Sequence, residues 1–486
     1  MIPKVSRTHW FTVDAEGFRQ LQVGREPWKL VKELVANAWD EPITRCELSV
    51  EPHRDDPDNL TYLACKDDSR LGFADLQSAR TFFRRTSKRR NPAARGRFNL
   101  GEKEILSVAR WARIVTTSGT LVFDGDGHVK SDPESKTDRG TTIELVIPWG
   151  EAERQEIVTK LRSFLPPRLK ALSVNGEPVP HRKPGHEIKC SLETVLEDES
   201  GLRPTTRRTR VHVHKATGAG GCVYELGVPV VELADCPYLI DVQQKVPVSP
   251  NRDTLRPAYL KDLLAEVLNH VAEDLTEENV SATWVRAASE DERASNETLK
   301  TVQRKRWGDK VALWSSDPHA NERAVARGYA LVHARTLSPE ERRRFVKDVG
   351  IRHASSLFPE QLREAKPIPQ DKWTASMRAI AGIFRRVGGK LLAQSVEIRW
   401  IHEFKMAHSA SYGNGTLALN KAHLAGWHRD SRLRAEHLKV LVHELAHEGP
   451  IGELEHAPEF RRRLERLAGE LAMLALEEPA MFSWSD

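Results

Sequence analysis

The chain has 486 residues, of which 39% are hydrophobic and 29% are charged, a balance that is typical of globular domains. No run of about 18 apolar residues occurs and the N-terminal sequence lacks an apolar leader, so we expect neither a membrane span nor a secretory signal. The net charge of +5 permits contact with nucleic acid without requiring it, and five scattered Cys residues exclude a disulfide framework, which favours a cytoplasmic location.

Residues 1–150 alternate helical and strand patterns. A helix over Trp28–Asp40 follows Pro27, a residue suited to the first turn, and its apolar residues recur at helical spacing. Short alternating runs predict strands at residues 48–50, 62–65, 113–117, 121–124 and 140–148. This mixture predicts an α+β sandwich.

The remaining chain predicts three further domains, so the expected class is an α+β multidomain protein. Residues 151–280 combine helices at 151–164 and 257–279 with strands at 171–174, 209–214 and 222–231. Residues 281–370 are charged and helical, with a helix start at Ser338-Pro339-Glu340-Glu341, and form a connector that ends near Pro367-Ile368-Pro369. Residues 371–486 predict strands at 396–401 and 416–420 among helices.

The clearest chemical motif is His443-Glu444-Leu445-Ala446-His447, at the end of an apolar helical pattern. His443 and His447 lie four residues apart, so both imidazoles project from one helix face and can bind one Zn²⁺. Glu444 follows at about 100° around the helix and can take a proton from a metal-bound water. The motif therefore predicts a zinc-dependent peptidase.

A third zinc ligand must come from beyond the helix, which ends at Gly449-Pro450. The best candidate is His456, at the head of the next helix. Glu453 and Glu455 are the alternatives, because carboxylates also bind zinc.

The C-terminal segment resembles the SprT/Spartan-like zincins over roughly the last 100 residues. In that family a third histidine stands in a His-Gly-Pro-x-Phe-like segment, which here reads His456-Ala457-Pro458-Glu459-Phe460, with Ala457 in place of the glycine. The family also has strands before the active helix, similar to residues 410–413 and 416–420 here. An edge strand at that position can hold an extended protein substrate.

A second site is indicated by Glu33 and Asn37, four residues apart on one helix face. A carboxylate and an amide at this spacing can orient water and hold a hydrated Mg²⁺. The segment 33–41 resembles the first motif of the GHKL ATPases, the gyrase, histidine kinase and MutL types. The resemblance implies that ATP binds here, that Glu33 activates the attacking water and that Asn37 holds Mg²⁺.

The segment 63–73 resembles the next motif of that family, Asp-x-Gly-x-Gly, whose aspartate accepts a hydrogen bond from the adenine amino group. Strand alternation favours Asp67 as that aspartate, Asp68 is the alternative, and Gly72 belongs to the same motif. Ser69 stands in place of a glycine, and the segment is one residue longer than the family pattern.

Two more segments follow in the family's order. Residues 96–103 resemble the glycine-rich lid that leads into a helix, where Gly96, Gly101 and Lys103 would meet phosphates; Asn99 replaces another glycine. The segment Gly140–Ile143 resembles the closing strand motif and adds Thr142 to the ATP site.

Outside this domain, Gln243-Gln244-Lys245 resembles the Gln-x-Lys loop of the gyrase-type transducer domain. The resemblance implies that Lys245 reaches the γ-phosphate, which would make it a sensor of ATP against ADP. A basic run coincides with the lid, and we expect solvated lid charges or charges that meet phosphates, with DNA contact as the alternative: Arg84, Arg85, Lys88, Arg89, Arg90, Arg95 and Arg97.

These patterns predict four domains: a GHKL-like ATP-binding domain (1–150), a transducer-like domain (151–280), a helical connector (281–370) and a SprT-like zincin domain (371–486). The expected function is an ATP-regulated zinc peptidase that acts on a protein substrate, with an ATP-dependent homodimer as the closed form. The alternatives are a nucleotide-switched DNA clamp with a structural zinc domain, and ATP-dependent remodelling without proteolysis.

Overall fold

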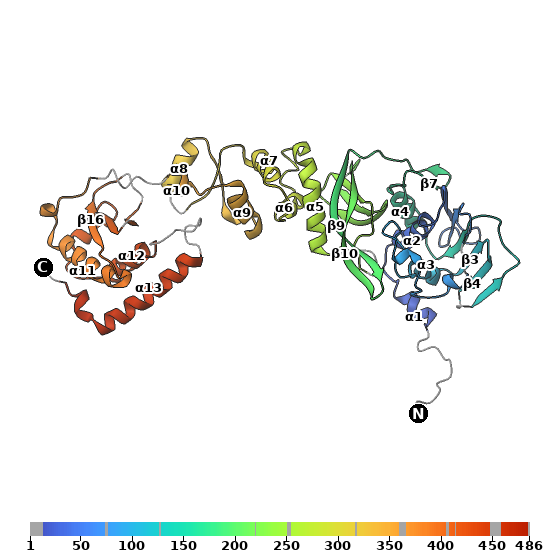
Figure 1. The fold of residues 1–486 in the computed structure, drawn as a ribbon, viewed down its shortest axis with the longest axis horizontal. Helices are drawn as coiled ribbons and strands as arrows, with labels where there is room; N and C mark the ends of the chain where they lie inside the picture. Colours follow the sequence, from blue (N-terminus) through green and yellow to red (C-terminus); the bar gives the residue numbers. More distant parts are fainter. Residues whose placement is uncertain are drawn as a thin grey trace, which may run out of the picture. The chain divides into compact units, whose positions relative to one another are not determined.

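The protein is represented by a computed structural model that divides into two compact units, Met1–Ser295 and Asn296–Asp486 (Figure 1). Several β-sheets combined with helices confirm the predicted α+β class. No helix of the described part of the chain is both long and apolar enough to cross a membrane. The structure describes residues 13–72, 76–125, 128–218, 220–249, 254–315, 318–358, 366–404, 408–413, 415–447 and 458–484.

The first unit begins with an eight-stranded sheet in the order β5-β4-β3-β6-β2-β1-β7-β8. Neighbouring strands are antiparallel except β1 and β7, which are parallel. Side chains alternate between the two faces, so one face carries the apolar residues that the sequence pattern predicted. The strands are β1 (Arg45–Pro52), β2 (Thr61–Asp67), β3 (Trp111–Thr116), β4 (Gly119–Asp124), β5 (Val129–Asp132), β6 (Thr142–Ile147), β7 (Ala171–Val174) and β8 (Glu177–Pro178).

Helices share a hydrophobic core with this sheet. The central one, α2 (Pro27–Trp39), has Pro at its first position, where the missing N–H costs nothing, and its bounds differ by one residue from the predicted helix. Three more helices belong to this part: α1 (Ala15–Gln20), α3 (Gly101–Val108) and α4 (Glu151–Leu161). The core fixes α2 across strands β1 and β2, which places its polar residues at the end of β2.

A second sheet completes the unit, in the order β12-β11-β13-β10-β9. The single strand predicted at 222–231 is wrong, because the chain reverses at Leu226 and Gly227, which both have positive φ (51° and 90°), the backbone of a tight hairpin turn. The elements are β9 (His186–Asp198), β10 (Gly201–Lys215), β11 (Gly221–Glu225), β12 (Val228–Leu233), β13 (Tyr238–Val242), α5 (Pro257–Val271) and α6 (Thr283–Ser289).

Strands β9 and β10 form a long ribbon whose register runs from Asp198↔Gly201 to His186↔Val213. Strand β13 pairs with β10 only from Val211 to Lys215. The part of β10 before Val211 is therefore bonded to β9 on one edge alone, and its polar side chains are exposed.

The second unit starts with a small parallel sheet that the sequence did not predict. Strands β14 (Val311–Leu313) and β15 (Ala330–Val332) are connected through α8 (Pro318–Ala326). Three-residue strands are too short to show an alternating pattern, so the segment resembled a helical connector. The predicted helix start at Ser338 is confirmed, since its Oγ accepts from Glu341 N at 3.1 Å. The other helices are α7 (Asn296–Trp307), α9 (Pro339–Arg344) and α10 (Ala354–Leu357).

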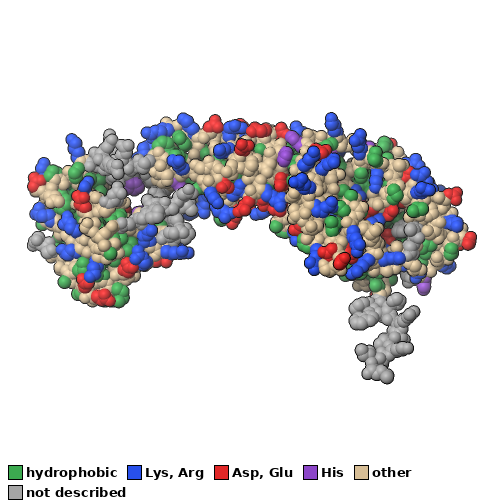
Figure 2. Space-filling model, in the orientation of Figure 1, with side chains coloured by type: hydrophobic (Ala, Val, Ile, Leu, Met, Phe, Trp, Pro, Cys, Tyr) green, Lys and Arg blue, Asp and Glu red, His purple; other side chains and the backbone are tan. Residues whose placement is uncertain are grey.

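The C-terminal part packs helices on a three-stranded sheet in the order β16-β18-β17. The predicted strands are confirmed to within one residue as β16 (Glu397–Ile401) and β18 (Thr416–Asn420), and β17 (Ala410–Gly413) forms the edge. The helices are α11 (Ala375–Leu392), α12 (Ala435–Leu445) and α13 (Pro458–Glu477). Basic and acidic side chains intermix over the visible surface of both units (Figure 2).

Candidate functional site

A cavity of about 240 Å³ lies where α2, the end of β2 and the start of α3 meet. Cys65 on β2 and Ile143 on β6 are register partners and give this cavity an apolar floor. Charged and amide groups from α2 and from the segment before α3 form the remaining wall. Six residues predicted for ATP binding line it together: Glu33, Asn37, Asp67, Gly72, Gly96 and Gly101.

The two neighbouring aspartates of the second motif take different roles. Asp67 faces the cavity and its Oδ1 accepts from Ser69 N at 2.8 Å and Thr141 N at 3.3 Å; burial raises its pKa against these hydrogen bonds. Asp68 points away and accepts from the backbone N–H groups of Thr44 and Arg45, and these bonds lower its pKa although burial opposes them. Of the two alternatives, only Asp67 is in position to meet a ligand.

The strand ends beside Asp67 require glycine at position 140. Gly140 has φ +80°, and a Cβ there would lie 2.1 Å from Asp67 O. Its N–H donates to Ser69 O at 2.7 Å, which ties the two strand ends together. The next residue in the cavity wall is Thr141, whereas the predicted Thr142 lies in the β6 ladder outside the wall.

We call residues 84–103 the lid-like segment. Asn99 in this segment stands where the GHKL motif has a glycine. Asn99 has φ 53°, a left-handed conformation that Asn tolerates better than most residues. Its Nδ2 donates to Ser78 O at 3.0 Å and to Thr81 O at 2.7 Å, and these bonds hold the segment. Two residues later, Gly101 lets the Glu33 carboxylate approach so closely that a Cβ would lie 2.1 Å from Oε2.

Asn37 and the first turn of α3 meet at the same wall. Asn37 Nδ2 donates to Glu102 Oε2 at 3.5 Å, and Lys103 Nζ donates to Glu102 Oε1 and to Ser78 O, both at 2.6 Å. Burial lowers the pKa of Lys103, although Glu102 opposes this shift. Lys103, predicted for the phosphates, is thus paired with protein groups and does not belong to the cavity wall.

Lys245 reaches the lid-like segment from the second sheet's side. The residue is fully buried; its Nζ donates to Lys88 O, and its backbone N–H donates to Pro92 O at 2.9 Å. Lys245 itself does not line the cavity, but Lys88 does, with its Nζ 2.7 Å from Glu41 Oε1. The predicted sensor therefore touches the wall through the backbone of Lys88.

The basic run around the lid departs only in part from the expectation of solvated or phosphate-facing charges. Arg85 and Arg90 are exposed and Lys88 lines the cavity, but three arginines are buried. Arg89, Arg95 and Arg97 are 8%, 3% and 3% exposed. Arg97 makes a bidentate pair with Glu225 on β11, at 2.5 and 3.1 Å, and also donates to Val246 O at 2.7 Å. These side chains fasten the lid-like segment to the second sheet, so they are not free to contact DNA.

Asp40, at the end of α2, anchors the same segment from the other side. Its Oδ1 accepts from Arg95 N at 2.8 Å and from Arg95 Nη1 at 3.1 Å, and its Oδ2 accepts from Gly96 N at 2.7 Å. Burial alone would raise the pKa of Asp40, but Arg95 and these N–H groups lower it. The lid-like segment is therefore held by buried charge on both sides.

Sequence reasoning missed several residues of the cavity wall. Thr141 adjoins the predicted Thr142, and Lys88 and Arg97 were noted only for their charge. Ser78 and Thr86 carry no motif, because their place in the wall follows from the path of a loop. The missed polar residues are Glu41, Ser78, Thr86, Lys88, Arg97 and Thr141.

The second candidate site lies at the end of α12. The helix ends at Leu445, and His447 continues it by a turn in which its N–H donates to Glu444 O at 3.1 Å. The ring centroids of His443 and His447 are 5.2 Å apart. Two imidazoles on one tetrahedral Zn²⁺ at about 2.0–2.1 Å have ring centres about 5 Å apart, so this pair fits a shared ion.

Glu444, near the end of α12, faces the edge strand β17. Burial raises the pKa of Glu444 to about 8, although a hydrogen bond from the backbone N–H of Tyr412 on β17 acts to lower it. Phe460 on α13 packs against both rings, with centroids 5.4 Å from His443 and 4.6 Å from His447. The rings of His443, His447 and Phe460 thus form one cluster.

The sequence predicted a third zinc ligand beyond the helix. His456, and its alternatives Glu453 and Glu455, lie outside the described residues. Within the described part of the chain, no group of three His, Cys, Asp or Glu side chains is placed to hold a metal ion. Among the described residues, His443 and His447 are therefore a pair without a third such side chain placed beside them.

Comparison with known proteins gives structural likenesses alone. No protein-family model matches the chain, and no curated protein matches it. The N-terminal domain of a DNA repair protein is similar at 16% identity and TM-score 0.32, over 50% of this chain and 91% of that one. The ATPase region of Saccharomyces cerevisiae topoisomerase II is similar at 10% identity and TM-score 0.28, over 42% and 61%. Neither likeness assigns a family or a function.

Proposed function

We propose that the first unit binds ATP with Mg²⁺ and hydrolyses it in the manner of the GHKL ATPases. The supporting observation is the meeting of Glu33 and Asn37, Asp67 and Gly101 in one wall, from a helix, a strand end and a helix start. The apolar floor suits a base, and the start of α3 directs backbone N–H groups toward the side where phosphates would lie.

In this proposal each residue has a defined task. Asp67 accepts a hydrogen bond from the adenine amino group, and Asn37 contributes its amide oxygen to the hydrated Mg²⁺. The metal, when bound, neutralises phosphate charge. Glu33, held against Gly101, orients the attacking water and takes its proton.

We further propose that the second unit is a zinc peptidase. The spacing of the His443 and His447 rings supports this, and His456 is proposed as the third ligand. Zinc, when bound, would polarise the peptide carbonyl and lower the pKa of a water. Glu444 would take the proton of that water, and the edge strand β17 would hold the substrate backbone by strand addition.

The link between the two units is proposed from their presence on one chain. Nucleotide binding would close or dimerise the first unit, and this closure would control peptide hydrolysis in the second. A cleavage assay on a denatured protein tests the scheme, with wild-type chain, Glu444→Gln and Glu33→Ala compared with and without ATP.

The expected result is complete loss of cleavage for Glu444→Gln and altered ATP dependence for Glu33→Ala. Zinc content measured on His443→Ala separates metal loss from misfolding, because the chain should remain folded while its zinc falls below one equivalent. If neither ATP withdrawal nor Glu33→Ala changes the rate of cleavage, the regulatory proposal fails while the peptidase proposal stands.

A further inference from the structure

A second, larger cavity lies on the β9–β10 ribbon and shares no lining residue with the first cavity. It encloses about 810 Å³, and four Lys and Arg side chains line it together with a histidine and amide groups. No carboxylate is among the described residues of its wall. We call it the ribbon groove, and its defining residues are Lys189, Arg207, Arg208, Arg210, His212 and Gln243.

The ribbon register places like charges side by side. Arg210 is the cross-strand partner of Lys189, and Arg208 lies two residues further along the same face of β10. Like charges directly opposite each other destabilise a sheet, so this arrangement costs the protein free energy. Side chains two residues apart on one face repeat at about 6.6–6.8 Å, which makes a row of cations.

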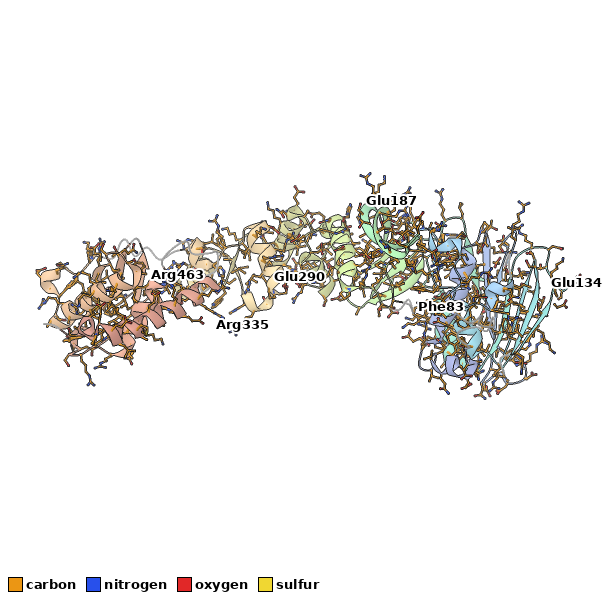
Figure 3. All side chains as sticks on the ribbon, turned by 60° about the horizontal axis from the view of Figure 1, so that its bottom comes forward. Phe83, Glu134, Glu187, Glu290, Arg335 and Arg463 are labelled. Atoms are coloured by element: carbon orange, nitrogen blue, oxygen red, sulfur yellow. The ribbon has the colours of Figure 1, made fainter. Side chains whose placement is uncertain are left out.

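Among the described residues, carboxylates neutralise only part of this row of cations. Glu187 on β9 lies 3.7 Å from Arg210 and 3.8 Å from His212, and it projects from the ribbon in Figure 3. For Lys189 and Arg208, the described residues provide no carboxylate within ion-pair distance. This differs from Arg97 of the lid-like segment, which is buried in a bidentate pair.

The groups that line the ribbon groove indicate the chemistry of a ligand that would fit it. A peptide held by its side chains needs apolar pockets, whereas this groove offers guanidinium, ammonium and amide groups. Guanidinium groups form bidentate hydrogen bonds with phosphate oxygens, and a two-stranded ribbon has the width that a major groove of DNA admits. The exposed cations follow the backbone edge of β10, where β13 has ended.

We propose that the ribbon groove binds the phosphodiester backbone of nucleic acid. Lys189, Arg208 and Arg210, which share one face of the ribbon, contact phosphates. Gln243 holds the end of this row in place, since its backbone N–H donates to Arg210 O at 2.9 Å and its side-chain amide donates to Asp241. This site is separate from the ATP and zinc sites, and its occupancy requires neither cofactor.

Fluorescence anisotropy with the full chain tests the proposal, using labelled duplex DNA, single-stranded DNA and RNA of equal length without nucleotide. The logarithm of the binding constant should fall linearly with the logarithm of salt concentration, by about 0.9 per contacted phosphate for a duplex and about 0.7 for a single strand. The nucleic acid that is bound most tightly at a given salt concentration is the preferred form. Arg208→Ala/Arg210→Ala should weaken binding at least about tenfold and reduce the duplex slope by about 1.8.

Two controls separate this effect from net charge and from misfolding. Arg54→Ala/Lys136→Ala removes two exposed cations from the first sheet and should leave binding within about twofold. Lys189→Gln should weaken binding while the thermal midpoint stays constant or rises, because it removes a like-charge pair with Arg210.

Wild-type affinity in Arg208→Ala/Arg210→Ala would overturn the proposal. So would the absence of binding to all three nucleic acids at low salt, or displacement by polyglutamate as effective as displacement by unlabelled DNA. Because the assay contains neither ATP nor zinc, its failure leaves the proposed enzymatic sites untouched.

Discussion

The buried pair between Arg97 and Glu225 joins the lid-like segment to the second sheet, and its removal gives the most direct test of how the first unit is held together. Both side chains are nearly inaccessible, at 3% and 4% exposure, and the pair is bidentate. Arg97 also lines the cavity between α2, β2 and α3, so the pair connects the wall of that cavity to β11.

The expected magnitude follows from burial. Glu225→Gln keeps the shape of the side chain but leaves the guanidinium of Arg97 without its counter-charge, which costs about 3–5 kcal/mol for a buried pair. Arg97→Met leaves Glu225 buried and unpaired, and it also takes a donor from Val246 O, adding about 1–3 kcal/mol. Arg97→Met/Glu225→Gln has no orphaned charge, so its destabilisation should be less than the sum of the two single substitutions by about 2 kcal/mol or more.

Urea unfolding of the full chain, followed by tryptophan fluorescence, measures these free energies. The transition of the first unit should shift to lower urea, and the transition of the second unit, whose core does not include the pair, should stay in place. A shift below about 1 kcal/mol for Glu225→Gln, or additive effects of the two substitutions, would refute the reasoning.

Three further predictions concern single positions. Gly101→Ala should displace the Glu33 carboxylate from its close contact, so ATP turnover should fall at least about tenfold with a smaller change in ATP affinity, measured by phosphate release and calorimetry; equal turnover would contradict this. Asp241 is buried, and burial raises its pKa from 3.8 to about 7. Its contribution to stability, up to about 4 kcal/mol, is therefore fully present below pH 4 and is lost as the pH rises through 7. Asp241→Asn should flatten the pH dependence of the free energy of unfolding, and an unchanged pH profile would argue against this reasoning. Asn99→Ala should lose two hydrogen bonds while keeping a positive φ, which should make the lid-like segment more susceptible to limited proteolysis; wild-type resistance would contradict this expectation.

The elements that the sequence predicted correctly are those with strong periodicity or a local signal. The helix α2 has a regular apolar face and Pro27 at its start, and β18 alternates cleanly, so both were placed within a residue. Strands β14 and β15 were missed because three residues carry no period, and the hairpin at Leu226-Gly227 was missed because apolar residues run through it.

The residues predicted for the candidate site also divide into those that line the cavity and those that do not. Glu33, Asn37 and Asp67 were predicted from the resemblance of their segments to the GHKL motifs, and all three line one cavity. Lys103 was misplaced in the cavity because its neighbour Glu102 binds it, a pairing that depends on the loop carrying Ser78. No local pattern distinguishes a lysine that meets phosphate from one that meets a carboxylate.

The lid-like arginines show the limit of reading charge from sequence. Their clustering suggested solvent or phosphate, but the second sheet supplies Glu225 to one of them from more than 100 residues away. The local sequence does not mark the exposed arginines on β10 as a binding surface, because only the ribbon register aligns Arg208 and Arg210 with Lys189. Tertiary pairing decides which cations remain available for a ligand.

The central claim is that the first unit holds a nucleotide with its base against Asp67. Calorimetric titration of the full chain with ATP and Mg²⁺ tests it on neighbouring variants, Asp67→Asn and Asp68→Asn, which change the same chemical group on opposite sides of one strand end. We predict one ATP per chain, at least about tenfold weaker binding for Asp67→Asn, and wild-type binding for Asp68→Asn. No binding of ATP to the wild-type chain, or equal affinities for the two variants, would contradict the claim.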